Sequence, residues 1–373
     1  MTSLRSALFS LAIALIALTA AAQSLPNGLT KRVVGDYGYW SKYQNPPYSA
    51  AQIPFHQLTH INHAGVGFDA YGQLSVPEGF LEPALISGAH AAGVKVLLLL
   101  GGNFQGLEAT GAVDTLVANI AAFEQQYGYD GADLDWEYPE TDADRLMLVT
   151  LVQKLRASNP NYVLSIDEAP WGGYGYDMSQ LKFTLNYFNL MMYDCAGPWT
   201  QHGQLNSPIF WNFADPDPWE CQPGGSVQEV GTEMSKIVPA EQLNMGTPFY
   251  GYYYKDINKE FALCPDTAWT PDQDCDNVAV ASGNYGPNFK PLINQQGWHT
   301  VYDPVAKVPY MLRDDGSNGY ITYDDAYSTS YRVWYSDWVM NLGGTFMWSL
   351  DADYDGHSQD LMTAMYNASL SPK

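Results

Sequence analysis

Asp130-Gly131-Ala132-Asp133-Leu134-Asp135-Trp136-Glu137-Tyr138-Pro139 is the stretch around which this chain is organised. In a β-strand, alternate side chains point to the same face, so Asp133, Asp135 and Glu137 form one row of carboxyl groups. Negative charges held this close cannot all ionise freely, and at least one carboxyl is expected to keep its proton near neutral pH. A protonated acid at the end of such a row can give a proton to a departing oxygen.

The two side chains between these carboxyls, Leu134 and Trp136, point to the other face of the strand, where a covering layer can bury them. An acidic strand end and a cation site are the alternative interpretations. Strict alternation that ends in Trp-Glu-Tyr-Pro favours a catalytic role over both.

A strand-then-helix rhythm surrounds this stretch. Strands are predicted at 32–40, 58–68, 95–100, 130–137, 162–168, 187–194, 243–250 and 343–350, and helices at 83–92, 112–127, 142–158 and 328–342. Thr141 or Asp142 is the expected N-cap of the third helix. Apolar strands that alternate with helices indicate a parallel sheet. Eight of them predict an α/β fold, a (β/α)8 TIM barrel over residues 30–366, whose active site lies at the carboxyl ends of the strands.

One connection is too long for a barrel loop. Residues 252–321 separate the seventh strand from the last helix, whereas a loop between strand and helix usually has only a few residues. This stretch contains Cys264, Cys275 and a strand-like segment at 319–323. Either a small α+β insertion or a surface loop held by a disulfide is expected here.

The first 22 residues have the pattern of a secretory signal peptide. Arg5 gives a positive start, residues 7–17 are apolar, and Ala20-Ala21-Ala22 is a small-residue cleavage site. Polar sequence follows at once, and no other stretch is long enough to cross a bilayer. The mature protein is expected to be secreted.

Composition narrows the range of partners. The formal charge is −23, from 17 basic and 40 acidic residues, which argues against nucleic acid and anionic membranes. The 27 Tyr and 11 Trp suit stacking against sugars, although aromatic residues also fill ordinary cores. No cofactor and no metal are expected, because no His/Cys cluster has zinc spacing. We expect a monomer.

Four cysteines lie at 195, 221, 264 and 275. In an oxidising compartment they can form two disulfides, and three pairings are open. Pairing neighbours along the chain, Cys195–Cys221 and Cys264–Cys275, closes the shortest loops and is preferred.

The acidic stretch resembles the DGxDxDxE signature of the family 18 glycoside hydrolases, the chitinases and their relatives. Other segments match the family in the same order. Met191-Met192-Tyr193-Asp194 resembles its MxYD motif, residues 246–251 resemble its strand-seven PFYG segment, and residues 343–351 resemble its closing strand. The resemblance extends over about residues 33–351.

The resemblance implies a secreted chitinase that cleaves chitin or chito-oligosaccharides by substrate-assisted retaining catalysis. Glu137 is then the general acid and base, Asp135 orients the acetamido group, Asp133 shares a proton with Asp135, and Tyr193 positions the acetyl carbonyl. Trp348 is expected to form the floor under the sugar. The other expected substrate-binding residues are Asp194, Met191, Tyr37, Gly101, Gly102 and Trp136.

Several positions depart from the family pattern. Leu99 stands where a serine is usual, Gly65 stands where an aromatic residue is common, and Asp167-Glu168 replace small apolar residues. These two additional carboxyls are expected to affect the pH optimum.

Two other functions stay open. One is an endo-N-acetylglucosaminidase that acts on N-glycans or bacterial wall glycans, and the other is a chitin-binding lectin without catalysis. The lectin is disfavoured because such relatives usually lack the final Glu of the signature, and Glu137 is present. Candidate stacking residues of outer subsites are Trp171, Trp199, Trp211 and Trp219.

Overall fold

The structure is a computed structural model that describes residues 25–169, 175–216, 221, 225–265, 275, 277–282, 289–293 and 295–370. The segment interpreted as a signal peptide, 1–22, lies outside the described residues. Within the described part, no helix combines the length and the apolar character needed to cross a bilayer.

Eight parallel strands close into a barrel, as the sequence predicts. In spatial order they are β1 (Arg32–Gly38), β14 (Gly344–Trp348), β8 (Leu243–Pro248), β7 (Tyr187–Leu190), β6 (Val163–Glu168), β5 (Gly131–Asp135), β4 (Lys95–Leu100) and β2 (His60–Phe68). Pairing between β1 and β2 completes the ring. A short strand, β3 (Leu74–Ser75), extends β2 as a hairpin. The carboxyl ends of all eight strands therefore meet at one end of the barrel.

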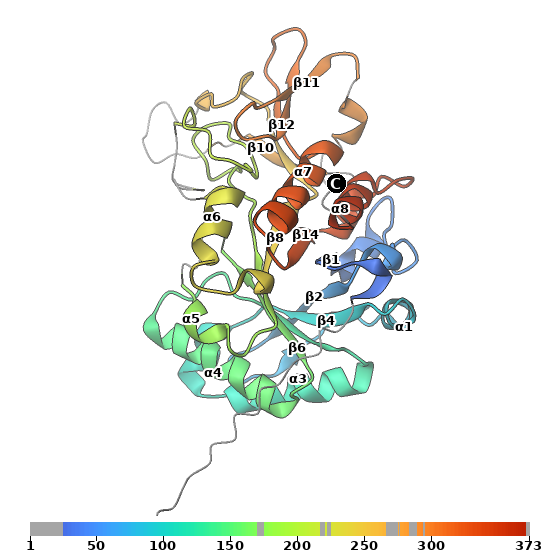
Figure 1. Ribbon diagram of the computed structural model, residues 1–373, viewed down its shortest axis with the longest axis vertical. Helices are drawn as coiled ribbons and strands as arrows, with labels where there is room; N and C mark the ends of the chain where they lie inside the picture. Colours follow the sequence, from blue (N-terminus) through green and yellow to red (C-terminus); the bar gives the residue numbers. More distant parts are fainter. Residues whose placement is uncertain are drawn as a thin grey trace, which may run out of the picture.

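Helices cover the outside of the ring (Figure 1). They are α1 (Pro83–Ala91), α2 (Phe104–Thr110), α3 (Val113–Tyr127), α4 (Asp142–Ser158), α5 (Met178–Leu181), α6 (Val227–Met234), α7 (Ala326–Trp334) and α8 (Asp360–Ser369). On α3, buried positions recur at Leu116, Ile120 and Glu124, the spacing of one helix face. Thr141 caps α4 through a capping box with Asp144, so the first of the two N-cap candidates is the one used.

The last predicted helix was placed wrongly at both ends. It was expected at 328–342, but α7 begins at Ala326, because the Asp325 side chain accepts a hydrogen bond from the Ser328 N–H and caps the helix two residues earlier. At the other end, α7 passes into a π-helical turn over Tyr335–Val339. Helices α2, α5, α6 and α8 were not predicted.

The long connection between β8 and α7 contains a second sheet, which stands above the barrel in Figure 1. Its five antiparallel strands are ordered β10 (Val278–Ala281), β9 (Gly251–Tyr254), β13 (Tyr320–Thr322), β12 (Pro309–Arg313) and β11 (Trp298–Tyr302). A separate small apolar cluster supports it, formed by Phe289, Trp298, Met311, Ile321 and Tyr323.

The cysteines pair as preferred from the sequence. Cys195 is bonded to Cys221, and Cys264 to Cys275, which confirms both neighbouring pairs. The first disulfide holds the long loop that follows β7, directly after Asp194. The second lies in the connection that also carries the antiparallel sheet.

The buried carboxyl of Glu124 generates a testable prediction about stability. Burial raises the pKa of Glu124 to about 8, so the folded protein keeps this proton while the unfolded chain loses it at a lower pH. The stability that this group contributes is therefore present below about pH 4 and is lost as the pH rises towards 8.

We expect Glu124→Gln to remove this dependence, because glutamine stays neutral in both states. Its free energy of unfolding should equal that of the parent near pH 4 and exceed it on the order of 1–3 kcal/mol at pH 8. Denaturant titrations at several pH values measure the difference, with the exposed helix residue Glu108→Gln as the matched control. An equal gain at both pH values would contradict the prediction.

Candidate active site

The row of carboxyls begins inside the barrel with Asp133. This side chain is completely buried and accepts hydrogen bonds from Asn62 on β2, at 3.1 Å, and from the Ser165 hydroxyl on β6. Asn189 on β7 lies 3.4 Å from the same carboxyl oxygen as Ser165. Burial raises the pKa of Asp133 to about 6, and the hydrogen bonds from Ser165 and Asp167 oppose that rise.

Asp135, two residues along the strand, holds a proton. Its pKa is raised to about 8, first by burial and then by the negative charges of Glu137 and Asp133. Asp135 also forms a hydrogen bond with Glu137, which lies just beyond the end of β5. Asp135 is thus hydrogen-bonded to Glu137, and the expectation that Asp133 shares a proton with Asp135 stays a prediction.

A cavity of about 220 Å³ opens above this pair. Its lining residues come from the ends of several barrel strands: Asp135, Glu137, Tyr138, Asp167, Met191, Tyr193, Asp194, Tyr250 and Trp348. Six of the residues predicted from the sequence are among them. An acid at the rim, a proton on its neighbour and aromatic walls suit the protonation of a leaving group on a ring-shaped substrate.

A second cavity of about 290 Å³ adjoins the first and shares Asp194, Tyr250 and Trp348 with it. Its wall includes Trp40, a partly exposed residue whose ring centroid lies 6.4 Å from that of Trp348. Val280 and Ser282, in and after β10, also line this cavity. The antiparallel sheet therefore forms part of the wall.

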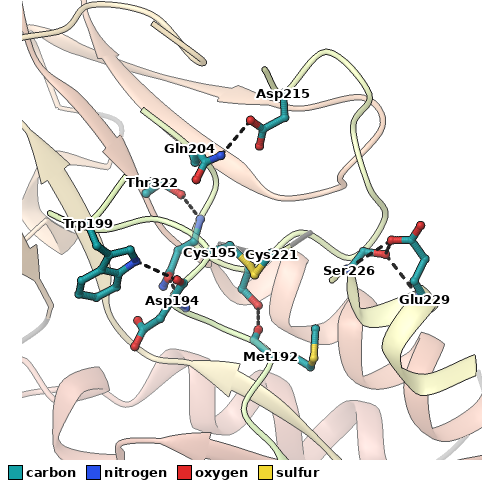
Figure 2. Close-up of a disulfide and its surroundings, with 12 residues drawn as sticks. Met192, Asp194, Cys195, Trp199, Gln204, Asp215, Cys221, Ser226, Glu229 and Thr322 are labelled. Atoms are coloured by element: carbon teal, nitrogen blue, oxygen red, sulfur yellow. Dashed lines mark hydrogen bonds between the residues drawn. A yellow bond between two sulfur atoms is a disulfide. The ribbon is translucent and has the colours of Figure 1, made fainter. Parts of the chain in front are cut away.

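Asp194 is held in place by side chains from several directions. Its backbone has a φ of 65°, in the left-handed region that Asp tolerates better than most residues. Tyr250 and Tyr252 donate hydrogen bonds to one of its carboxyl oxygens, the second over 2.7 Å. The Trp199 indole donates to its carbonyl over 3.2 Å, next to the disulfide of Cys195 (Figure 2).

Asn206 connects this region to its neighbours. Its side chain accepts a hydrogen bond from the Asp194 N–H, at 2.9 Å, and donates to the Tyr250 carbonyl, at 3.2 Å. Its own N–H donates to the Thr322 hydroxyl on β13, at 2.8 Å. One residue thus ties the end of β7, the end of β8 and the second sheet together, a role that the sequence analysis missed.

Four of the predicted substrate-binding residues are not among the described residues that line the cavities. Tyr37 is buried and donates a hydrogen bond to Glu82 over 2.7 Å, because its position on β1 points it away from the barrel axis. Trp136 faces the covering helices and stacks on Phe104, with ring centroids 4.6 Å apart. Gly101 and Gly102 follow the end of β4, and an added Cβ at Gly101 would lie 3.7 Å from the Asp135 carbonyl oxygen.

The candidate stacking tryptophans in the loops differ in exposure and in the residues that they contact. Trp199 is partly exposed and packs edge-on against Tyr252 of the second cavity. Trp211 is buried with the disulfide of Cys195 and Cys221, so it anchors the loop. Trp171 and Trp219 lie outside the described residues.

The interior polar residues that support the row were also missed, apart from Asp167. They are Asp36, Asn62, Ser165, Asn189 and Asn244, one on each of five barrel strands, β1, β2, β6, β7 and β8. In the sequence, these residues could have been recognised as single polar residues at inward-facing positions of otherwise apolar strands. Leu99 lies beside Asp133 in the sheet register and has no hydroxyl, and Ser165 supplies one from the other side. In the described part of the chain, no group of three or more His, Cys, Asp and Glu is arranged to hold a metal.

The tyrosines at Asp194 lead to a test. Burial raises the pKa of Asp194, and the hydrogen bonds from Tyr250 and Tyr252 hold it down. We expect Tyr252→Phe to raise the pKa of Asp194 further, because it removes one donor to the charged form. Carboxyl-carbon NMR titration measures this. Tyr253→Phe is the matched control, since Tyr253 packs on Trp298, and an equal shift in both variants would contradict the assignment.

Comparison with known proteins agrees with this geometry. The model of the glycosyl hydrolases family 18 matches residues 32–353. The chain is 29% identical over 285 residues to Endochitinase 1 of Metarhizium robertsii and 30% identical over 343 residues to a probable endochitinase of Caenorhabditis elegans. These alignments cover 70% and 87% of this chain, but it spans only 62% and 52% of the two relatives.

Among solved structures, the fold is similar to that of a Group IV chitinase from Ostrinia furnacalis, in complex with allosamidin. The TM-score is 0.77 at 23% identity, and the match covers 90% of this chain and 98% of that one. The family match extends from β1 to the residues just after β14, the whole barrel. This chain therefore belongs to family 18 of the glycosyl hydrolases.

Proposed function

We propose that this protein hydrolyses the β-1,4 bonds between N-acetylglucosamine units of chitin and chito-oligosaccharides. The observation that carries the proposal is the hydrogen-bonded pair of Asp135 and Glu137 in a cavity walled by Tyr193, Asp194 and Trp348. The names of the relatives, endochitinases and chitinases, support chitin as the substrate.

The proposed reaction begins with Glu137, which protonates the glycosidic oxygen. The N-acetyl carbonyl of the sugar attacks the anomeric carbon, the bond to the leaving sugar breaks, and an oxazolinium-type intermediate forms. Glu137 then takes a proton from the incoming water, and the anomeric configuration is retained. The exposed position of Glu137 at the rim allows both the leaving sugar and the water to reach it.

Asp135 and Tyr193 would hold the acetamido group. When the proton of the pair lies on Glu137, Asp135 is a carboxylate that can accept the acetamido N–H and offset positive charge on the intermediate. Tyr193 and Asp194 form the adjoining wall, and Trp348 offers a ring face beneath the sugar. The second cavity, with Trp40, continues the groove for further sugar units.

Secretion is part of the proposal. The apolar segment at 7–17, followed by small residues, is a pattern of exported proteins, and two disulfides suit an oxidising compartment. The first disulfide follows directly on Asp194, at the wall of the proposed sugar site.

The first prediction concerns the acid. Glu137→Gln should lower kcat on chito-oligosaccharides about 10²-fold or more, because the amide cannot donate the proton, while binding remains. Product analysis on an oligosaccharide ladder measures turnover, and calorimetry measures binding. Glu140→Gln, an exposed acid in the loop that follows, is the matched control.

The alternatives are decided by the same experiment. Near-normal turnover by Glu137→Gln would refute the assignment of the acid. Binding without cleavage by the parent protein would favour the lectin. Cleavage of N-glycans or wall glycans, but not of chito-oligosaccharides, would favour the endo-N-acetylglucosaminidase.

The second prediction concerns pH. The pKa of Asp135 is about 8, so its proton is present below that pH and is lost above it. The parent should therefore lose activity as the pH rises through about 8. Asp135→Asn should lower kcat about 10²-fold and shift this alkaline limb, because asparagine cannot titrate and Glu137 then titrates alone. An unchanged profile in the variant would show that the limb belongs to another group.

A further inference from the structure

Asp167 is a carboxyl of the catalytic cavity that the proposed reaction does not use. It lies on β6 directly beside Asp135 in the sheet register, and it is 3% exposed at the cavity wall. Asn189 on β7 donates a hydrogen bond to its Oδ1 over 3.0 Å. Asp167 also forms a side-chain hydrogen bond with Asp133.

The hydrogen bond between Asp167 and Asp133 requires a proton, since two carboxylates cannot bond to each other without one. Asp133 already accepts at both oxygens, from Asn62 at one and from the Ser165 hydroxyl at the other. Its surroundings therefore stabilise the anion. Asp167 accepts from Asn189 at one oxygen and is left to carry the proton at the other.

We propose that Asp167 is a positioning residue: as a neutral acid it donates a hydrogen bond to Asp133, keeps Asp133 as the anion of the row, and so leaves the movable proton with Asp135 and Glu137. The inference rests on the proposed function and deepens it. Asp167 acts through Asp133 and touches none of the reacting atoms.

The groups that face Asp167 are acidic or neutral. Burial raises the pKa of Asp167 well above its ordinary value, and the negative charges of Asp133, Asp36 and Asp135 raise it further. The phenols of Tyr176 and Tyr193, which are neutral, also lie near Asp167. These surroundings favour the protonated carboxyl.

The Asp36 carboxyl, on the opposite side of the barrel interior, also raises the pKa of Asp167. Asn62 bridges Asp36 and Asp133, with distances of 2.9 and 3.1 Å from its amide nitrogen. Asp133 thus accepts a hydrogen bond from an amide on one side and, in this proposal, a hydrogen bond from a carboxylic acid on the other. Leu99, its neighbour in the sheet register on β4, contributes no polar group.

The test compares two substitutions of Asp167 that differ only in whether a donor remains. Asp167→Ala removes the donor, and Asp167→Asn keeps an N–H that can point at Asp133 and an oxygen that can accept from Asn189. Glu168→Gln is the matched control, because Glu168 is the next residue on β6 and alternates to the outer face.

On a chito-oligosaccharide, we expect Asp167→Ala to lower kcat at least about tenfold with KM within about threefold of the parent. Losing the donor disfavours the Asp133 anion, so the acidic limb of the pH profile should move to higher pH. Asp167→Asn should keep kcat within about threefold and leave that limb in place. Equal defects in the Ala and Asn variants, no defect in either, or the same defect in Glu168→Gln would overturn the proposal.

Infrared spectroscopy gives a readout that does not need turnover. At neutral pH the protonated-carboxyl absorption band should be weaker in Asp167→Asn than in the parent, in which Asp135 and Glu124 also contribute, and equal absorption in the two proteins would overturn the proposal even if Asp167→Ala does not fold. If the parent cleaves no chito-oligosaccharide, the proposed function fails, while the band still decides whether Asp167 is the donor.

Discussion

The structure depends on burying several carboxyl groups together inside one end of a barrel. Asp36, Asp133 and Asp167 are almost completely removed from water, and charged carboxylates there would repel one another and lose their hydration. Protonation of some carboxyls and hydrogen bonds from amide or hydroxyl donors offset the repulsion and the lost hydration. Asn62 and Ser165 supply donors to Asp133, and burial raises the pKa values of Asp36 and Asp167 well above their ordinary range.

A polar column continues this network away from the cavity. Arg32 donates to the Asn244 side chain over 2.8 Å, and Asn244 donates to Asn189 over 3.0 Å. Asn189 in turn reaches both Asp133 and Asp167. Arg32, Asn244 and Asn189 lie on three different strands, so the barrel has to form before these side chains are aligned. The cationic end of this column therefore lies on the far side of two amides from the acids.

The additions to the barrel serve the same end of the strands. The second sheet contributes Val280 to the cavity wall and, through Thr322, holds Asn206 in place. Asn206 and the two tyrosines at 250 and 252 fix Asp194 beside a disulfide. Asp194, a left-handed residue in the loop after β7, is thereby kept in one position. The groove is shaped by these loops, while the acid pair is positioned by the ring of strands.

The sequence by itself determined the barrel and the row of three carboxyls at the end of one of its strands, because both follow from local patterns. Apolar runs such as 95–100 and the helix at 142–158 were predicted with their observed bounds, and alternation placed Asp133, Asp135 and Glu137 on one face. Tertiary structure alone decided which side chains donate to Asp133 and Asp167, that Tyr37 bonds to Glu82 instead of lining the cavity, and that short segments near 278–313 pair as a sheet. These outcomes depend on contacts between strands far apart in the chain, which carry no periodic signal.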